Sequence, residues 1–405
     1  MNSKLKLAIL TLSLAIVLFF AIGTFGVHAS GSEGAYRQLG VYSEVLQRVR
    51  SEYVEEPNFN AVRVGALHGL LESLDANSSY LSPDEYKRFK ERKQEGKAGI
   101  GATLSKRFGL AAIVSVVPGG PADKAGLQPG DIIESVEGRN TKDIPLAELR
   151  SVVSGEKGSN ITFTILRQTK AEPDKVTVTR DEVSVPGTEL KELENSIGYI
   201  KPGMLTKGKA QEVANKIKQA HKDGAKKLIL DLRNNSEGDY AEGVAVANLF
   251  LDHGNIASLK GQTVARQDFN ADPGKAITKL PMVVIVNRGT SGAAEIVAAA
   301  LLDDQRADVL GDKTWGSGSV QKTIEMSDGS AVILSVAKYY SPSGKSIQDV
   351  QVTPNILVAD ADLIDTGEDD NAPDEAGAAQ EQKKAQAQRA DEQLKRAVAV
   401  LKNKG

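Results

Sequence analysis

The chain reads LILDLRNNSEG at residues 228–238, VNRGTSGAAEI at 286–296 and GDKTWGSGSVQ at 311–321. The first stretch opens with continuous apolar residues, which is typical of a strand buried on both faces of a sheet. Each stretch then becomes polar or rich in glycine. Strand and helix patterns alternate around the three stretches, and this alternation predicts an α/β core.

Together the three stretches resemble the C-terminal processing peptidases, also called tail-specific proteases. A fourth string, YYSPSGKSIQ at 339–348, matches the same family. The resemblance covers nearly the whole chain after residue 35. It implies an α/β peptidase core of the ClpP/crotonase type over residues 184–358, where members of the family carry a serine nucleophile and a lysine base.

The same resemblance implies that both dyad positions are substituted. The family serine stands three residues before a glutamate, here Glu295, and Gly292 occupies its place. The family lysine stands between two glycines, and Ser317 occupies its place. Glycine has no hydroxyl for attack, and a serine hydroxyl cannot replace a neutral amine as general base. We therefore expect no intact catalytic pair, with Glu295 as an assisting residue that has lost its dyad.

The oxyanion region is altered as well. The family motif Asn-Pro-Gly-Gly reads Asn235-Ser236-Glu237-Gly238 here, and the resemblance assigns the oxyanion donors to Gly238 and Ala293. An oxyanion is stabilised by donors aimed at the developing negative charge. Because Glu237 is a carboxylate beside that position, its charge has the wrong sign.

A shift of one residue offers an alternative in which the chain is an active serine-type endopeptidase. Ser291 would then be the nucleophile, with Lys313 or Lys322 as base. If residue 291 were already helical, its side chain would project about 100° away from position 292, which opposes this alternative. Crotonase-type chemistry uses an oxyanion hole without a nucleophile, but no coenzyme site is evident in the sequence.

A second domain is indicated by GPADKAGLQPGDIIESVEG at 120–138, which resembles a PDZ signature and places a PDZ domain over residues 96–183. The loop Gly99-Ile100-Gly101 precedes a strand that starts at Ala102. Successive backbone N–H groups in such a loop can capture a peptide carboxylate, while the peptide adds to the sheet as a strand. Protein or peptide C-termini are therefore the expected partners, which favours a non-catalytic binder.

The N-terminus predicts export. Lys4 and Lys6 precede an apolar run over 7–27, and small residues follow before Ser30. This run is longer than a signal-peptide core and close to the ~20 residues that span a bilayer. Residues 1–29 are therefore expected to act as a signal or transmembrane anchor. The body would then lie in the cell envelope on the periplasmic or extracytoplasmic side, anchored to the membrane or secreted.

Three further segments complete the organisation. Residues 30–95 have apolar residues at helical spacing and form an N-terminal helical region. Residues 359–379 are acidic and nearly free of apolar side chains, as in a disordered linker. Residues 380–405 form a charged helix with a narrow apolar stripe, which is expected to pack on the body.

Composition excludes several classes of function. The 405 residues carry a net charge of -3, which argues against binding nucleic acid through a broad basic face. The chain has no cysteine and only four histidines, none at ligand spacing, so neither a cofactor nor a metal site is predicted. A homo-oligomer, or a hetero-oligomer in which the chain is the structural partner of an active paralogue, is compatible with the sequence.

Overall fold

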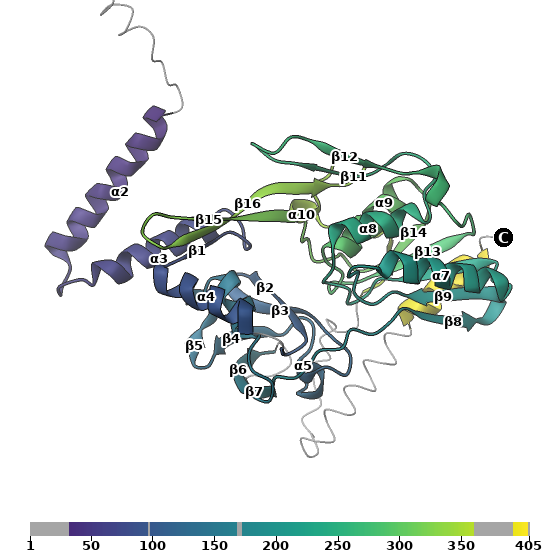
Figure 1. The fold of residues 1–405 in the computed structure, drawn as a ribbon, viewed down its shortest axis with the longest axis horizontal. Coiled ribbons are helices and arrows are strands. Elements are labelled where there is room, and N and C mark those ends of the chain that lie inside the picture. Colours follow the sequence, from purple (N-terminus) through teal and green to yellow (C-terminus); the bar gives the residue numbers. More distant parts are fainter. Residues whose placement is uncertain (1–31, 96–97, 168–171, 360–391, 404–405) are drawn as a thin grey trace, which may run out of the picture. The chain divides into compact units, whose positions relative to one another are not determined.

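The computed structural model describes residues 32–95, 98–167, 172–359 and 392–403 (Figure 1). The predicted anchor over 1–29 and nearly all of the predicted linker lie outside the described residues. The chain divides into two compact units, residues 1–63 and 64–405. In the first unit, α2 (Ser32–Glu52) exposes Leu39, Tyr42 and Val45. Along the described ranges, no helix has both the length and the apolar character needed to cross a membrane.

The predicted PDZ domain contains an antiparallel sheet with the strand order β2-β3-β4-β6-β7, and β5 pairs with β4. Its core is built from side chains such as Ile133 and Phe163, which alternate along the strands with exposed or half-buried residues. Because β2 ends the order, one of its edges is not paired to another strand of this sheet. The elements are β2 (Ala102–Arg107), β3 (Leu110–Val116), α5 (Pro121–Lys124), β4 (Ile132–Val136), β5 (Arg139–Asn140), η1 (Thr141–Asp143), α6 (Leu146–Val152), β6 (Asn160–Leu166) and β7 (Asp174–Thr179).

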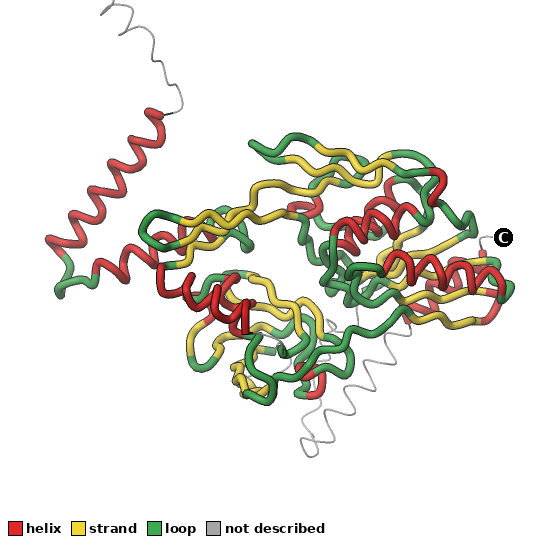
Figure 2. Tube along the Cα trace, in the orientation of Figure 1, coloured by secondary structure: helices red, strands yellow, loops and turns green. Residues whose placement is uncertain are grey.

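The main sheet of the peptidase-like core has the order β17-β14-β13-β10-β9-β8, and only β8 runs antiparallel to its neighbour. Figure 2 shows the strands and helices alternating along this part of the chain. The strands and helices are β8 (Glu189–Leu193), η2 (Glu194–Ser196), β9 (Ile197–Lys201), α7 (Lys209–Lys222), β10 (Lys227–Asp231), α8 (Tyr240–Asn248), η3 (Pro273–Lys275), β13 (Met282–Val286), α9 (Ala293–Asp303), β14 (Asp308–Gly311) and β17 (Ile356–Leu357).

Both faces of this sheet are buried, as the continuous apolar run predicts. Leu228 and Leu230 of β10 pack with α7, α8 and α9 on one face. Ile229, one residue out of phase, packs on the other face with Ala397 and Leu401 of the C-terminal helix, residues 392–403. Successive residues of a strand point to opposite faces, so one strand serves both layers. The apolar stripe of the C-terminal helix therefore packs on the body.

A second sheet has the order β1-β16-β11-β12, with β15 also paired to β16. Its strand β1 comes from the predicted N-terminal helical region, so that region contributes to the sheet of the core. The elements are α3 (Phe59–Glu72), β1 (Ser79–Leu81), α4 (Pro83–Glu95), β11 (Asn255–Lys260), β12 (Gln267–Asn270), β15 (Ser319–Glu325), β16 (Ala331–Tyr340) and α10 (Ile347–Val350).

Candidate active site and peptide groove

The three motif stretches meet at one edge of the main sheet. They follow the carboxyl ends of β10, β13 and β14, which are parallel neighbours with Asp231 opposite Ile285 and Val286 opposite Gly311. In open α/β sheets this edge is where ligands bind. Strand order alone thus brings together segments up to about 80 residues apart in the sequence.

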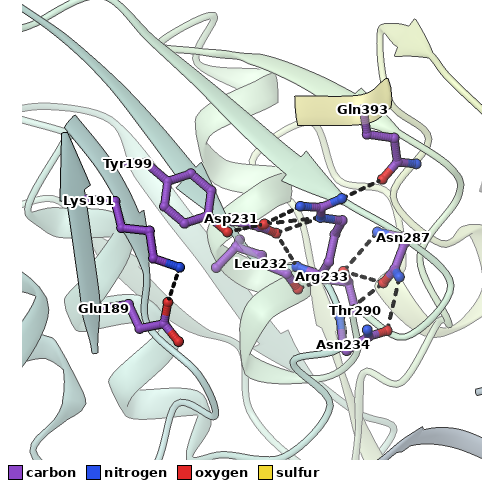
Figure 3. Close-up of polar contacts among 10 residues, drawn as sticks. All are labelled: Glu189, Lys191, Tyr199, Asp231, Leu232, Arg233, Asn234, Asn287, Thr290 and Gln393. Atoms are coloured by element: carbon purple, nitrogen blue, oxygen red, sulfur yellow. Dashed lines mark hydrogen bonds and ion pairs between the residues drawn. The ribbon is translucent and has the colours of Figure 1, made fainter. Parts of the chain in front are cut away.

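Side-chain hydrogen bonds fix the first two stretches against each other (Figure 3). The Asn234 backbone N–H donates to Asn287 Oδ1 at 3.0 Å, and Asn287 Nδ2 donates to Asn234 Oδ1 at 3.0 Å. Thr290 Oγ1 donates to the Leu232 carbonyl at 2.8 Å. These contacts satisfy polar groups at the strand ends and hold both turns in register.

A buried ion pair lies at the base of the first stretch (Figure 3). Asp231 is only 1% exposed and accepts hydrogen bonds from Arg233 Nε at 2.9 Å and Tyr199 Oη at 2.7 Å. Burial alone would raise the pKa of Asp231, but the Arg233 guanidinium holds that pKa below its usual value. Arg233 Nη1 also donates to Gln393 Oε1 at 3.3 Å, which connects the C-terminal helix to this stretch.

Gly292 forms a sharp turn between β13 and α9. Its φ is 62° and its ψ is -119°, a backbone conformation that L-residues rarely adopt. A Cβ at this position would lie 4.0 Å from its nearest neighbour outside the turn, the Ser317 carbonyl oxygen. The position assigned to the nucleophile therefore lies beside the backbone of the position assigned to the base, and a small side chain at residue 292 would meet no closer atom.

Glu295 joins the second and third stretches. Its side chain is fully buried and accepts backbone N–H bonds from Gly292 at 2.9 Å, Gly316 at 2.8 Å and Ser317 at 2.8 Å, and a hydroxyl bond from Thr314. Burial raises the pKa of Glu295 to about 7, against the opposing effect of these four donors. The carboxyl group thus holds both assigned dyad positions through their backbones.

Ser317 is half-buried, and its carbonyl accepts a hydrogen bond from Tyr240 Oη at 3.3 Å. The Tyr240 ring stacks on Tyr339 with centroids 4.4 Å apart, which fixes its position. Burial raises the pKa of Tyr240 to about 12, so its hydroxyl is a donor at neutral pH.

The residues of the shifted dyad are placed differently. Ser291 is 4% exposed, and its backbone N–H donates to the Asn235 carbonyl at 2.8 Å, whereas Lys313 and Lys322 are exposed. The helical argument against Ser291 does not apply, because α9 begins at Ala293 and residue 291 belongs to the preceding turn. The structure opposes the shifted dyad for a different reason: Ser291 is buried, whereas its two possible bases are exposed.

In the assigned oxyanion region, Gly238 packs closely against Leu205. Gly238 bridges to Leu205, and a Cβ at Gly238 would lie 2.5 Å from the Leu205 carbonyl oxygen, so only glycine fits. Within the described residues, no acceptor is paired with the Gly238 N–H. Ala293 is the first residue of α9, where a helix leaves its N–H groups without helical acceptors.

Glu237 does not point freely into this region. Its Oε1 accepts a hydrogen bond from Thr103 Oγ1 of PDZ strand β2 at 2.9 Å, and Ser236 Oγ donates to the same hydroxyl at 2.7 Å. The Arg107 guanidinium of β2 lies 4.9 Å from the Trp315 ring centroid, a cation–π contact. A cavity of about 300 Å³ adjoins these contacts and is lined by residues of β2, residues 75–77, residues 315–317, Gln348 and Gln351.

The predicted carboxylate loop lies at the start of β2. The Gly99 N–H donates to the Asp181 carbonyl at 3.0 Å, which leaves the next backbone groups, those of Ile100, Gly101 and Ala102, as the donors to consider. Ile100 is 1% exposed, while Gly101 and Ala102 are half-buried. The edge of β2 lies beside α6. We call the surface along this edge, where a peptide strand would be expected to add, the peptide groove.

Comparison with known proteins gives the family. The model of peptidase family S41 matches residues 196–358, and the PDZ domain model matches 113–167. A carboxy-terminal-processing protease of Bartonella bacilliformis is 32% identical over 359 residues, which cover 84% of this chain and 82% of that protein. The chain belongs to peptidase family S41.

Other members of the family agree in fold and extent. The carboxy-terminal processing protease CtpA of Bacillus subtilis is 31% identical over 366 residues, 88% of this chain and 78% of that protein. A photosystem II D1 C-terminal processing protease structure superposes with a TM-score of 0.66 at 26% identity, covering 78% of this chain and 86% of that one. The predicted family and the α/β peptidase core with a PDZ domain are thus confirmed.

Several residues of this site were missed by sequence reasoning. Thr314 and Tyr240 contact Glu295 and Ser317, and Arg150 of α6 reaches the β2 edge. Thr314 stands within the third motif stretch and was the only one with a signal in the sequence. Tyr240 and Arg150 reach the site because elements distant in the sequence pack together, and no sequence motif indicates these contacts.

Proposed function

We propose that this chain is an exported S41-family protein that has lost proteolysis and binds protein C-termini through its PDZ domain. The observation that carries the proposal is Gly292, which occupies the nucleophile position in a turn that suits glycine and supplies no hydroxyl. Covalent acyl transfer needs a nucleophile with a base within hydrogen-bond reach. Neither group is present at the assigned positions.

The base position supports the same proposal. Ser317 carries a hydroxyl where the mechanism needs an amine, and its backbone N–H is bound to Glu295. Glu237 is bound by Thr103 beside the assigned oxyanion donor Gly238, so a carboxylate stands near the place where negative charge would develop. In contrast, the edge of β2 and the loop before it offer backbone groups with which a peptide strand and its carboxylate could form hydrogen bonds. Export rests on residues 1–29 and remains part of the proposal.

The test uses the purified full chain in detergent micelles, an unfolded protein substrate and a fluorophosphonate probe. We expect neither cleavage nor labelling, alongside binding of peptides that end in an apolar residue with a free carboxylate. Ser291→Ala is the matched variant. Labelling of the parent chain that disappears in Ser291→Ala would establish the shifted dyad and overturn the proposal. Absence of both cleavage and peptide binding would favour a structural partner of an active relative instead.

A further inference from the structure

The peptide groove of the PDZ domain already contains a charged side chain. Arg150 projects from α6, and its Nε donates to the Leu104 carbonyl of β2 at 3.1 Å. Its Nη2 donates to Asn77 Oδ1 at 3.3 Å. The Leu104 side chain is buried in the domain core, so its carbonyl is the part that faces α6 across the groove. Arg150 therefore bridges the two walls of the groove.

This bridge competes with a ligand. A peptide that adds to the edge of a sheet forms main-chain hydrogen bonds with the edge strand, whose N–H and C=O groups are otherwise unpaired. The Leu104 carbonyl is one acceptor on that strand, and Arg150 already uses it. A peptide N–H can take the best position on this carbonyl only if the guanidinium moves away.

The charge of Arg150 has no direct counter-ion. Arg139 and Arg167 of the same domain contact Glu148 at 2.9 Å and Asp131 at 2.8 Å. Among the residues that the structure describes, no carboxylate lies within ion-pair distance of Arg150, whose two hydrogen bonds go to neutral oxygens. The charge of Glu237 acts to raise the pKa of Arg150, but the Glu237 carboxylate is hydrogen-bonded to Thr103 and forms no ion pair with Arg150.

Arg150 is also accessible. The residue is exposed to solvent, although partial burial of its guanidinium lowers the pKa of Arg150, and this planar group has donors beyond the two that are in use. An incoming carboxylate could accept two parallel N–H bonds from such a group, and these are shorter and stronger than bonds to a neutral carbonyl. A ligand with an acidic side chain at this level of the groove would supply the missing counter-ion.

We propose that Arg150 is the specificity-determining residue of the groove and selects C-terminal peptides with an acidic side chain near Leu104. The peptide carboxylate draws the guanidinium off the Leu104 carbonyl, and the freed carbonyl then accepts a peptide N–H. A neutral peptide has to displace Arg150 without replacing its hydrogen bond. This inference rests on the proposed function, because it concerns the same groove.

The experiment measures binding of fluorescein-labelled decapeptides of alanine and serine that end in leucine with a free carboxylate. In each peptide one of the four residues before the leucine is Glu or, in the matched peptide, Gln. The full chain is compared with Arg150→Ala and Arg150→Lys. Arg266→Ala, which removes an exposed arginine outside the PDZ domain, is the charge-matched control. Melting curves check that each variant is folded.

We expect the parent chain to prefer Glu over Gln by about tenfold at one position, as one charge-assisted contact would give. Arg150→Ala should abolish the preference while binding the Gln peptide at least as tightly as the parent. Arg150→Lys should keep a reduced preference, and Arg266→Ala should change neither affinity.

Two results would overturn the inference and leave the proposed function standing. One is a Glu preference that survives Arg150→Ala. The other is equal affinity for Glu and Gln peptides in the parent, with both bound through their free C-terminus. If folded parent protein binds no peptide in the series, the proposed function fails and the inference fails with it. A uniform loss of affinity in Arg150→Ala would assign the residue a structural role only.

Discussion

Glu295 in the peptidase-like core and Arg150 in the PDZ domain are both ionisable residues at the proposed sites, but their surroundings differ. Glu295 is fully buried and bound by three backbone N–H groups and one hydroxyl, all from this chain. Arg150 is exposed and bound to two neutral oxygens. A buried charge that is satisfied internally holds a backbone in place, whereas an accessible charge without a counter-ion is free to respond to a ligand.

The largest effect is expected from placing a serine and a lysine at the assigned dyad positions of the core. Gly292→Ser with Ser317→Lys places a hydroxyl and an amine at the two assigned positions, whose backbones lie side by side, so weak peptide hydrolysis should appear. Adding Glu237→Gly should raise the rate further, because it removes a negative charge beside the assigned oxyanion donor Gly238. Turnover of a fluorogenic peptide is the measurement.

The single variants are the controls, and each should stay at background because a nucleophile and its base act as one unit. A side chain at φ 62° is strained, so Gly292→Ser should also lower stability by about 1–3 kcal/mol. A folded triple variant without turnover would show that the side chains at 292 and 317 do not meet as assigned.

The second effect separates buried charge from exposed charge within the core. Arg233→Met leaves the Asp231 carboxylate buried without its cation and should lower the free energy of unfolding by about 3–5 kcal/mol. Arg288→Met, which breaks the more exposed pair with Asp312, should cost less than about 1 kcal/mol. Urea denaturation of both variants gives the comparison, and equal losses would contradict it.

The third effect is a pH dependence from Glu295. Its pKa is raised from 4.5 to about 7, so between these values the folded chain holds a proton that the unfolded chain has released. This contribution to stability is present below pH 4.5 and is lost as the pH rises through 7. The difference between parent and Glu295→Gln should therefore shrink by about 3 kcal/mol from pH 4.5 to pH 8.

Denaturation of both proteins at several pH values tests the sign. A difference that grows with pH would mean that the four donors outweigh burial and keep Glu295 ionised. In either case Glu295→Gln should destabilise the core, because an amide cannot accept all four hydrogen bonds.

The smallest effect concerns the PDZ loop. Amidating the C-terminus of a bound peptide removes the charge that backbone N–H groups of Ile100 and Gly101 would contact. We expect about a tenfold loss of affinity, about 1.4 kcal/mol, measured by fluorescence anisotropy. Equal affinities of acid and amide would show that this loop is not a carboxylate site.

The sequence predicted the family, the α/β core and the PDZ domain, because strands such as 227–231 and the string at 120–138 carry local patterns. It could not predict the partners of Glu295, since residues 316 and 317 reach it only through the order of β10, β13 and β14. The turn at Ser291 was also unpredictable, because Gly292 ends the strand-to-helix connection one residue before α9. The contact of Arg150 with the Leu104 carbonyl could not be predicted either, because it depends on α6 packing beside β2.

Trp315 is the single tryptophan of the chain; it belongs to the third motif stretch, and its ring contacts the Arg107 guanidinium of β2. Tryptophan emission responds to the polarity and charge around its ring. Selective excitation of tryptophan would therefore report on one place only, the contact between the PDZ strand and the core. The molecule thus carries its own optical probe, and a spectral change on adding a peptide would follow that contact without any label.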